Sequence, residues 1–364
     1  MPLRRVKSIL SLLFPCAAML VLILDSKIAL QGAQMGLELC IQTVIPSLFP
    51  FFVISILLTG TLSGRQIAIF KPICRFCKMP FGAENLLLVG LLGGYPVGAK
   101  CIYEAWKQGQ ITAADAKRYL GFCNNAGPAF IFGMCGSLFS KSWIGWILWG
   151  IHVLSALLVG RVLPENKSVP MGISIPDQTT LVQAMGKAIT AILSVCGWVV
   201  LFRVILAFCQ RWFMWLLPAH WRSVLDGILE LTNGCNGLTA VESEGVRFVL
   251  CAAFLGFGGL CVALQTASVV GELGMGMYFP GKVMQCAFSC CLAGLFASLV
   301  YRICSPVLPG ICSVFLLFLA AAKKTVAFPK GLVYNVEKKR KGEFTCYSGR
   351  KLRSPAATVP VAQR

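Results

Sequence analysis

Long apolar runs, separated by short polar or charged stretches, dominate the chain and set its predicted elements. A helix needs about 20 apolar residues to cross the hydrocarbon core of a bilayer. Runs of roughly that length occupy residues 8–24, 36–62, 143–163, 188–217, 283–303 and 307–322. The sequence therefore predicts an all-α polytopic membrane protein that has the lipid bilayer as a partner.

Four further apolar segments are short or contain glycine, proline and carboxamide residues. They occupy residues 85–99, 119–139, 224–238 and 248–270. A run of about 15 residues reaches about 22 Å as a helix, whereas the hydrocarbon core is about 30 Å thick. We therefore expect broken or re-entrant helices in these segments.

The order of features is similar in the first and second parts of the chain. Each part has a long span, a short interrupted segment, a charged stretch, a segment with polar and glycine residues, and an uninterrupted span. This order predicts two related halves. The predicted divisions are a first span at 1–35, a first half at 36–163, a linker at 164–180, a second half at 181–322 and a basic tail at 323–364.

Basic residues predict the orientation in the membrane. Arg4, Arg5 and Lys7 precede the first apolar run, and residues 65–78 hold four basic residues and no acid. Cytoplasmic loops are enriched in Lys and Arg, so we expect both segments, and both termini, in the cytoplasm. The first run also resembles the apolar part of a secretory signal peptide, but its length favours an uncleaved span.

Composition excludes an ordinary soluble enzyme. Hydrophobic residues make up 57% and charged residues 13% of the chain, and the mean hydropathy is +0.76. Soluble domains usually contain about 25% charged residues. The formal net charge is +19, and the tail 323–364 holds 11 basic and 2 acidic residues, which gives +9. Because basic groups flank or follow apolar spans, they indicate membrane topology and lipid contact rather than nucleic-acid binding.

The interrupted segments and their surroundings hold the candidate binding residues. Lipid cannot pair a free backbone N–H or C=O, so interrupted helices persist only where protein or a wet cavity covers them. Transporters use paired interrupted helices to hold a solute near the membrane centre. The candidate solute-binding residues are Ser47, Gly94, Tyr95, Lys100, Asn124, Asn125, Gly127, Thr232, Asn233, Gly234 and Gln265.

Structural roles compete with these assignments. A glycine in a membrane helix commonly permits close packing against a neighbouring helix. Asn124 and Asn125 are stronger candidates, because adjacent carboxamides in an apolar run need hydrogen-bond partners. Glu230 is either a functional carboxylate or the edge of an interfacial helix, and we leave both interpretations open. Lys100 and Arg118 both fit a topological role better than anion binding. Lys100 is the better ligand candidate of the two, because it directly follows the interrupted segment 94–98.

Two local signals lie between the apolar segments. Thr112 is expected to cap a helix that starts after it, because its hydroxyl can accept a free backbone N–H and Asp115 follows three residues later. Cys74 and Cys77 form a CxxC motif without a second pair at zinc-like spacing. That isolation favours two cytoplasmic loop thiols over a metal or redox centre.

Few residues suggest catalysis or a cofactor. The 18 cysteines are scattered through apolar runs, which argues against a disulfide framework. His152 and His220 are the two histidines of the chain, so neither a histidine-based triad nor a histidine-rich metal site is favoured. No GxxxxGK[ST] phosphate loop occurs. We expect no enzymatic activity, no catalytic or metal-binding residues and no cofactor, and any transport should be secondary or facilitated.

The interrupted segments resemble a known family. The matching segments are VIPSLFPF at 44–51, GYPVGAK at 94–100, FCNNAGPAF at 122–130, ELTNG at 230–234 and FGGLCVALQ at 257–265. In order and content they are similar to sporulation integral membrane proteins of the YlbJ type, over about residues 30–320. The resemblance implies two nucleoside-recognition, or Gate, domains and a location in the mother-cell or forespore membrane of an endospore-forming bacterium.

The resemblance also implies a function. Family members are associated with moving dipicolinate, a small anionic heterocycle, so the implied partner is a small-molecule solute. Homo-oligomers and contacts with other sporulation membrane proteins are compatible with this role. The alternative is a non-transporting scaffold for a sporulation complex, which would dock through its basic tail and loops. A membrane enzyme is disfavoured, because no acid–base pair is visible.

Overall fold

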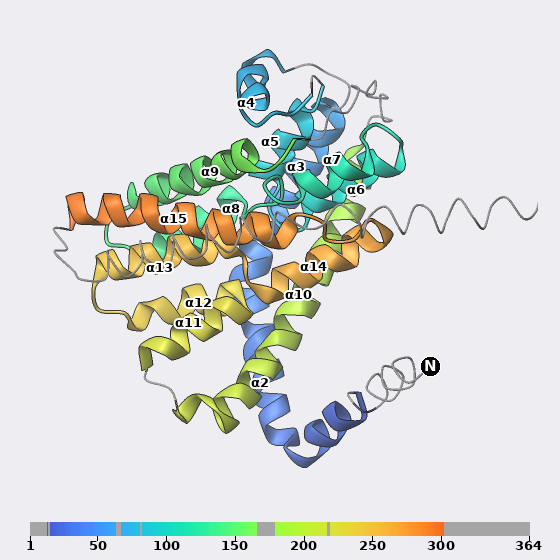
Figure 1. The fold of residues 1–364 in the computed structure, drawn as a ribbon. Coiled ribbons are helices and arrows are strands. Elements are labelled where there is room, and N and C mark those ends of the chain that lie inside the picture. Colours follow the sequence, from blue (N-terminus) through green and yellow to red (C-terminus); the bar gives the residue numbers. More distant parts are fainter. Residues whose placement is uncertain are drawn as a thin grey trace, which may run out of the picture. The chain divides into compact units, whose positions relative to one another are not determined.

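The computed structural model describes residues 13, 15–62, 67–80, 82–165, 179–216 and 219–301. Within these ranges the regular elements are helices and no strand occurs, which confirms the all-α prediction (Figure 1). Most of the predicted linker, the predicted span 307–322 and the basic tail lie outside the described residues.

The helix bounds are as follows. After an apolar helix at Pro15–Leu24, the α-helices are α2 (Ser26–Leu39), α3 (Ile45–Leu62), α4 (Lys71–Phe76), α5 (Glu84–Leu92), α6 (Val97–Lys107), α7 (Ala113–Tyr119), α8 (Pro128–Phe130), α9 (Ile144–Val162), α10 (Leu181–Trp212), α11 (Ala219–Leu229), α12 (Leu231–Gly237), α13 (Glu244–Phe257), α14 (Gly259–Val270) and α15 (Tyr278–Val300). The π- and 3-10 helices are η1 (Cys40–Val44), η2 (Ala68–Phe70), η3 (Ile131–Cys135), η4 (Gly136–Leu138), η5 (Met214–Leu216), η6 (Leu238–Ala240) and η7 (Gly271–Leu273).

Five helical stretches of the described residues are long and apolar enough to cross a membrane. They are Ser26–Leu58, Ile144–Val162, Leu181–Trp212, Glu244–Leu273 and Tyr278–Val300. Large apolar side chains on them are exposed, such as Leu193 on α10 and Leu299 on α15, as contact with lipid requires. The protein is therefore a helical membrane protein, as the apolar runs predict.

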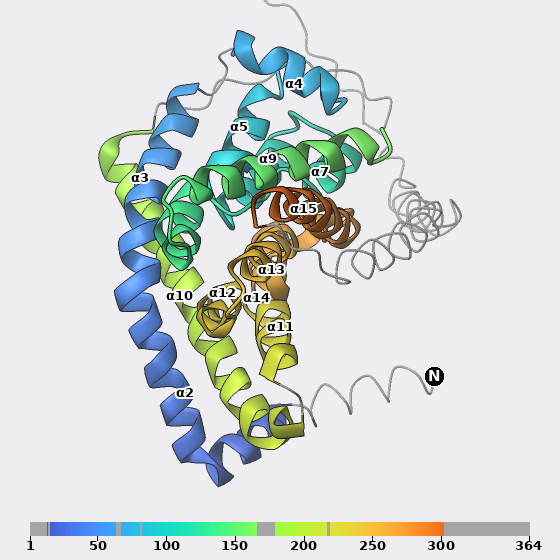
Figure 2. The same cartoon turned by 90° about the vertical axis from the view of Figure 1, so that its left-hand side faces the viewer.

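The helix that contains the second predicted span starts earlier than expected. The span was predicted from residue 36, whereas α2 begins at Ser26 and continues through η1 into α3. Polar residues near its start lower the local hydropathy, but packing against α10 supports the helix. Cβ atoms added at Gly32 and Gly36 would lie 2.9 Å from Cα of Val204 and Val200, so the two helices touch almost backbone to backbone (Figure 2).

Two apolar cores hold the helices together. The first joins η1, α3 and α10 to α5 and α6, through residues such as Phe52, Val89 and Ile192. The second joins η3, α9, α12, α13 and α15, through residues such as Ile131 and Phe248. In Figure 1, α9, α13 and α15 run side by side. Each core thus contains helices from both predicted halves.

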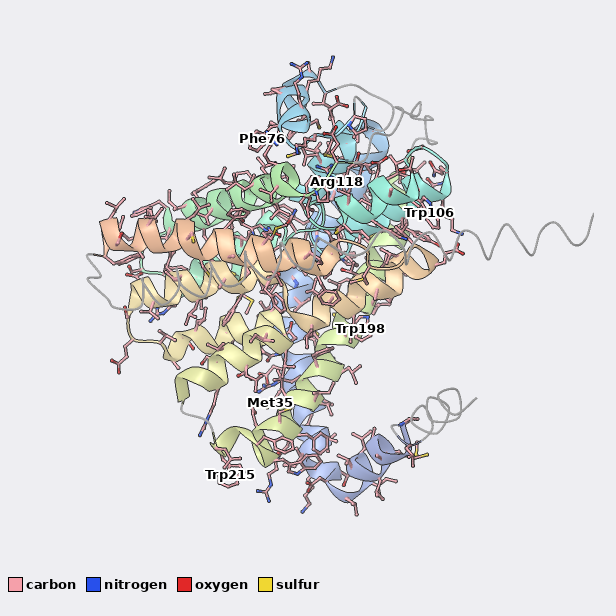
Figure 3. The ribbon with its side chains drawn as sticks, viewed as in Figure 1. Met35, Phe76, Trp106, Arg118, Trp198 and Trp215 are labelled. Atoms are coloured by element: carbon pink, nitrogen blue, oxygen red, sulfur yellow. The ribbon has the colours of Figure 1, made fainter. Side chains whose placement is uncertain are left out.

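The charged stretch of the first half is anchored at both ends of α7. Thr112 Oγ1 accepts a hydrogen bond from Asp115 N at 3.1 Å, so the predicted cap is confirmed. Arg118 lies where α7 approaches the end of α9 and is only 2% exposed (Figure 3). Its guanidinium donates to the carbonyls of Cys77 and Gly160, both at 2.6 Å. Arg118 therefore pairs backbone oxygens at the C-terminal ends of α4 and α9, which would otherwise be free, and stabilises the packing of α7 against them.

The CxxC thiols are buried rather than presented on a loop. Cys74 and Cys77 are 2% and 0% exposed, and Cys77 Sγ donates to the Leu157 carbonyl at 3.7 Å. Burial raises the pKa of both thiols to about 12. Because the thiolate is the reactive form, these two cysteines are protonated and unreactive at neutral pH.

Candidate functional site

The site is built where two non-helical segments of the first half meet. Residues 93–96 separate α5 from α6, and residues 120–127 separate α7 from α8. Cβ atoms added at Gly90 and Gly98 would lie 2.4 and 2.3 Å from the Cys123 carbonyl oxygen, so glycine is required for this contact. Gly94 (φ +74°) and Gly127 also touch through their backbones. These four glycines, of which Gly94 and Gly127 were predicted site residues, therefore bring the two segments together.

Asn124 joins this junction to the second half. Its Oδ1 accepts from the backbone N–H of Ala99, in the first turn of α6, at 3.2 Å. That N–H has no partner within the helix. Asn124 Nδ2 donates to Thr266 Oγ1 on α14 at 2.9 Å. The carboxamide is 0% exposed, and its hydrogen bonds connect α6 to α14.

Asn125 is equally buried and directs its carboxamide toward α15. Nδ2 donates to the carbonyls of Gly90 at 2.9 Å and Phe122 at 2.7 Å, which fixes which end is the oxygen. Oδ1 then accepts from Lys282 Nζ at 3.2 Å and from Gln285 Nε2 at 2.9 Å. The two carboxamides that the sequence singled out thus have buried partners on two different helices.

Lys282 is the central cation of the site. It lies in the first turns of α15 and is 0% exposed. Its Nζ donates to Gln285 Oε1 at 2.8 Å, Asn125 Oδ1 at 3.2 Å and Tyr95 Oη at 3.3 Å. Nζ also lies 5.2 Å from the centre of the Tyr95 ring. We call these four residues, Tyr95, Asn125, Lys282 and Gln285, the Lys282 cluster.

The Lys282 cluster holds an ionisable amine among neutral oxygens. An ionisable side chain in a membrane span is costly unless it is paired, and such residues commonly mark the path of a substrate or ion. All three hydrogen-bond acceptors of Lys282 are uncharged. The ion pair between Lys107 and Glu272 is exposed and involves neither Lys282 nor its partners. The cluster is therefore a candidate site for an anion.

Polar side chains continue from the cluster along the interface of α9 and α15. Gln285 Nε2 approaches the His152 carbonyl at 3.4 Å, and Ser289 Oγ donates to Ser155 Oγ at 2.9 Å. All of these residues are buried, and the two ring nitrogens of His152 have no hydrogen-bond partner. This interface is unusually polar for two apolar helices, and it extends the site toward the middle of α15.

The candidates of the second half form a separate group. Glu230 precedes α12 and accepts from the backbone N–H of Thr232 at 2.9 Å and of Asn233 at 2.6 Å, and from Asn233 Nδ2 at 2.6 Å. This geometry gives the carboxylate the role of a helix cap. A Cβ at Gly234 would lie 2.2 Å from Gly227 Cα, so this glycine packs α12 against α11.

Ser47, Gln265 and Lys100 have other surroundings. Ser47 donates to the Thr43 carbonyl at 2.6 Å and lines a cavity of ≈ 470 Å³. Gln265 Nε2 donates to Cys261 Sγ at 3.3 Å within α14. Lys100 is partly buried on α6. Among the hydrogen bonds of the described residues, the cation beside Asn125 is Lys282, not Lys100.

Sequence reasoning missed Lys282, Gln285, Thr266 and His152 as members of the site. Lys282 directly precedes the predicted span 283–303, so the prediction did not place it inside the membrane. The helix begins at Tyr278, however, and Lys282 is one turn inside it. The spacing Lys282, Gln285, Ser289 places three polar groups on one helical face, which is a signal that the sequence contains.

Comparison with known proteins finds a similarity to a sporulation membrane protein. The chain is similar to the sporulation integral membrane protein YlbJ of Bacillus subtilis (strain 168), with 25% identity over 319 residues, 75% of this chain and 77% of that protein. No protein-family model matches the chain. No solved structure matches it either.

Proposed function

We propose that the protein is a sporulation-associated transporter that moves a small anionic or heterocyclic solute by a secondary or facilitated mechanism. Dipicolinate is the first candidate solute. The observation that carries this proposal is the buried amine of Lys282, held in a membrane helix by three neutral oxygens. An ionisable side chain in this position is costly, so its presence points to a role in binding.

Because the hydrogen-bond partners of Lys282 are neutral, an anionic solute can take the place of one of them. A carboxylate binds an ammonium group more strongly than a neutral oxygen does. An anionic solute can therefore replace Tyr95 or a carboxamide as a partner of Nζ, and the displaced carboxamide can bond to the solute instead. In the described conformation Lys282 is fully enclosed, so entry of the solute requires the surrounding helices to move apart.

The hydrogen bonds between helices indicate which elements would move during transport. Asn124 connects α6 to α14, and Asn125 connects residues 120–127 to α15. Both connections run between the predicted halves, so motion of one half against the other would open and close the site. We keep the two Gate-like halves, the mother-cell or forespore membrane and the cytoplasmic termini as parts of this proposal. The likeness to YlbJ supports the sporulation role.

Ligand-dependent stabilisation tests the binding site. A solute at 100 times its Kd raises the free energy of unfolding by about 2.7 kcal/mol. We expect dipicolinate to raise the melting temperature of the purified protein in a saturable way, and Asn124→Ala to weaken binding at least about tenfold, or about 1.4 kcal/mol. The measurement is the shift in melting temperature across a concentration series, with nucleosides as comparison solutes.

Two further variants make this test specific. Asn124→Asp keeps the side-chain volume and the acceptor for Ala99 N, but it adds a negative charge that repels an anion. Gln108→Ala removes an exposed carboxamide at the end of α6 and should leave binding unchanged. If both Asn124 variants bind dipicolinate as tightly as the unaltered protein, the assignment of Asn124 to the site is wrong.

A further inference from the structure

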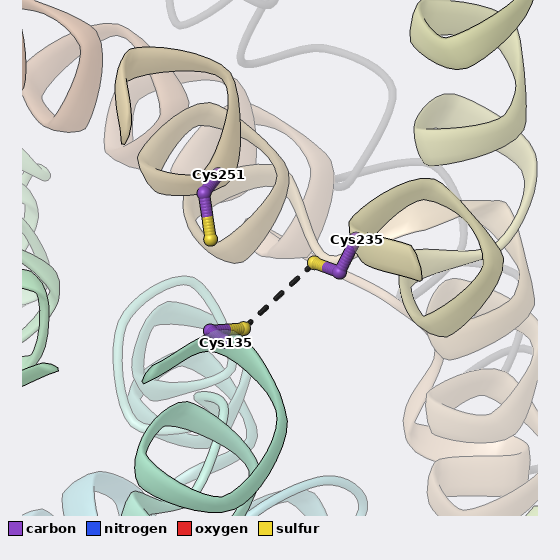
Figure 4. A group of neighbouring side chains, drawn as sticks. All are labelled: Cys135, Cys235 and Cys251. Atoms are coloured by element: carbon purple, nitrogen blue, oxygen red, sulfur yellow. Dashed lines mark hydrogen bonds between the residues drawn. The ribbon is translucent and has the colours of Figure 1, made fainter. Parts of the chain in front are cut away.

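Three cysteine side chains outside the Lys282 cluster meet inside the second apolar core. Cys135 ends η3, Cys235 lies on α12 and Cys251 lies on α13, and each is 0% exposed. Their sulfur atoms lie within 4.8 Å of one another, and the Sγ atoms of Cys135 and Cys235 are 3.8 Å apart. Figure 4 shows the three sulfur atoms directed toward one common space.

These separations match a metal centre made of thiolates. Zn²⁺ binds cysteine sulfur at about 2.3 Å, which places two sulfurs of a tetrahedral site about 3.8 Å apart. A planar site of three sulfurs with the same bond length gives about 4.0 Å. The three thiols therefore need only small side-chain shifts to bind one ion.

A packing role alone explains less of this arrangement. Buried cysteines often act as small apolar side chains. Packing, however, does not require three sulfur atoms from three separate elements to converge, and Cys135 and Cys235 are 100 residues apart in sequence. The neighbouring side chains, such as Phe139 and Leu255, are apolar. Packing alone therefore leaves the meeting of the three sulfur atoms unexplained.

A cavity lies close to this cluster, although none of the three cysteines lines it. Met134, next to Cys135, and Asn236, next to Cys235, both line the ≈ 470 Å³ cavity that Ser47 also lines. Its lining includes the polar side chains of Gln42 and Thr43. Water in such a cavity can deliver a hydrated ion and accept the protons that the thiols release.

We propose that Cys135, Cys235 and Cys251 together bind one thiophilic d10 metal ion, with Zn²⁺ as the probe. Each thiol loses its proton to water as its sulfur binds, so three thiolates and one divalent ion leave a net charge of −1. Soft sulfur ligands select ions of this kind over Mg²⁺ or Ca²⁺. The bound ion joins η3 to α12 and α13, and so fixes elements of both predicted halves.

Metal stoichiometry tests the proposal. The full chain is purified in detergent under reducing conditions, stripped with a chelator, loaded with Zn²⁺ and desalted, and its bound metal is counted by mass spectrometry. We expect Cys235→Ser and Cys251→Ser each to bind one equivalent less than the unaltered protein. Cys261→Ser, which removes a buried thiol of α14, should bind the full amount. Loading with Cd²⁺ should give the thiolate charge-transfer absorption in the same pattern.

Alkylation keeps the proposal testable if a variant folds poorly. In the unaltered protein, bound Zn²⁺ should slow alkylation of Cys135, Cys235 and Cys251 at least tenfold and leave Cys261 unchanged. Equal metal content in folded Cys235→Ser and the unaltered protein would overturn the proposal. So would equal alkylation rates with and without Zn²⁺, or a Cys135–Cys235 disulfide in the protein purified without oxidant.

Discussion

Replacing Lys282 with methionine is expected to lower solute uptake at least about tenfold, or about 1.4 kcal/mol, without unfolding the protein. The substitution removes the positive charge that pairs with the anion but keeps most of the side-chain volume. Asn125 Oδ1 retains a donor in Gln285 Nε2 at 2.9 Å, so the cluster loses one partner rather than all of them. The measurement is the initial rate of uptake into proteoliposomes, divided by the amount of inserted protein.

The melting temperature of the same variant separates a binding role from a structural one. Replacing a buried charge with an apolar group of similar size is often neutral or stabilising. We therefore expect Lys282→Met to melt at the same temperature as the unaltered protein or higher. Lys141→Met, which removes an exposed lysine in a loop, should change neither uptake nor melting. Unchanged uptake by folded Lys282→Met would contradict the assigned role.

Gly98→Ala is expected to destabilise the junction by about 1–3 kcal/mol or more, because overpacking forces the backbone apart. The added Cβ would lie 2.3 Å from the Cys123 carbonyl oxygen and 3.1 Å from Asn124 Cα. Both are backbone atoms, so no side-chain rotation relieves the clash. The displaced Asn124 should also lose its bonds to Ala99 and Thr266. Thermal unfolding in detergent measures the loss, and solute binding should weaken with it.

Gly150→Ala is the matched control for this substitution. Gly150 lies on α9, and nothing stands within 4 Å of an added Cβ. Alanine at an unstrained helical position stabilises by about 0.4–1 kcal/mol. We therefore expect Gly150→Ala to melt at or above the temperature of the unaltered protein. Equal melting of Gly98→Ala and Gly150→Ala would show that the close approach at Cys123 is absent in solution.

The fold follows from the sequence where local signals are strong. The apolar run 143–163 corresponds to α9, because its length and continuity outweigh single polar residues such as His152 and Ser155. Thr112 and Asp115 locate the start of α7, since a cap depends on residues that are adjacent in sequence. The start of α2 was placed too late, because its support comes from α10, which follows more than a hundred residues later.

The site was predictable only in part, since most of its contacts are long-range. Asn124 and Asn125 stand out in sequence, because buried carboxamides need partners. Their partners do not: Thr266 and Lys282 lie on α14 and α15, and nothing local assigns them. The three thiols of the cysteine cluster are likewise far apart in the chain. Ser47 and Thr232 are polar residues in apolar runs, as the prediction required. The fold, however, places Ser47 at a separate cavity and Thr232 beside Glu230, outside the Lys282 cluster.

Uptake of labelled dipicolinate into proteoliposomes tests the central claim most directly. Vesicles that hold the unaltered protein are compared with empty vesicles, and unlabelled dipicolinate and a panel of nucleosides serve as competitors. The account predicts saturable uptake that unlabelled dipicolinate suppresses and that depends on Lys282. If folded protein moves neither dipicolinate nor any nucleoside above the rate of empty vesicles, the transporter proposal is wrong, and a scaffold in a sporulation membrane becomes the better description.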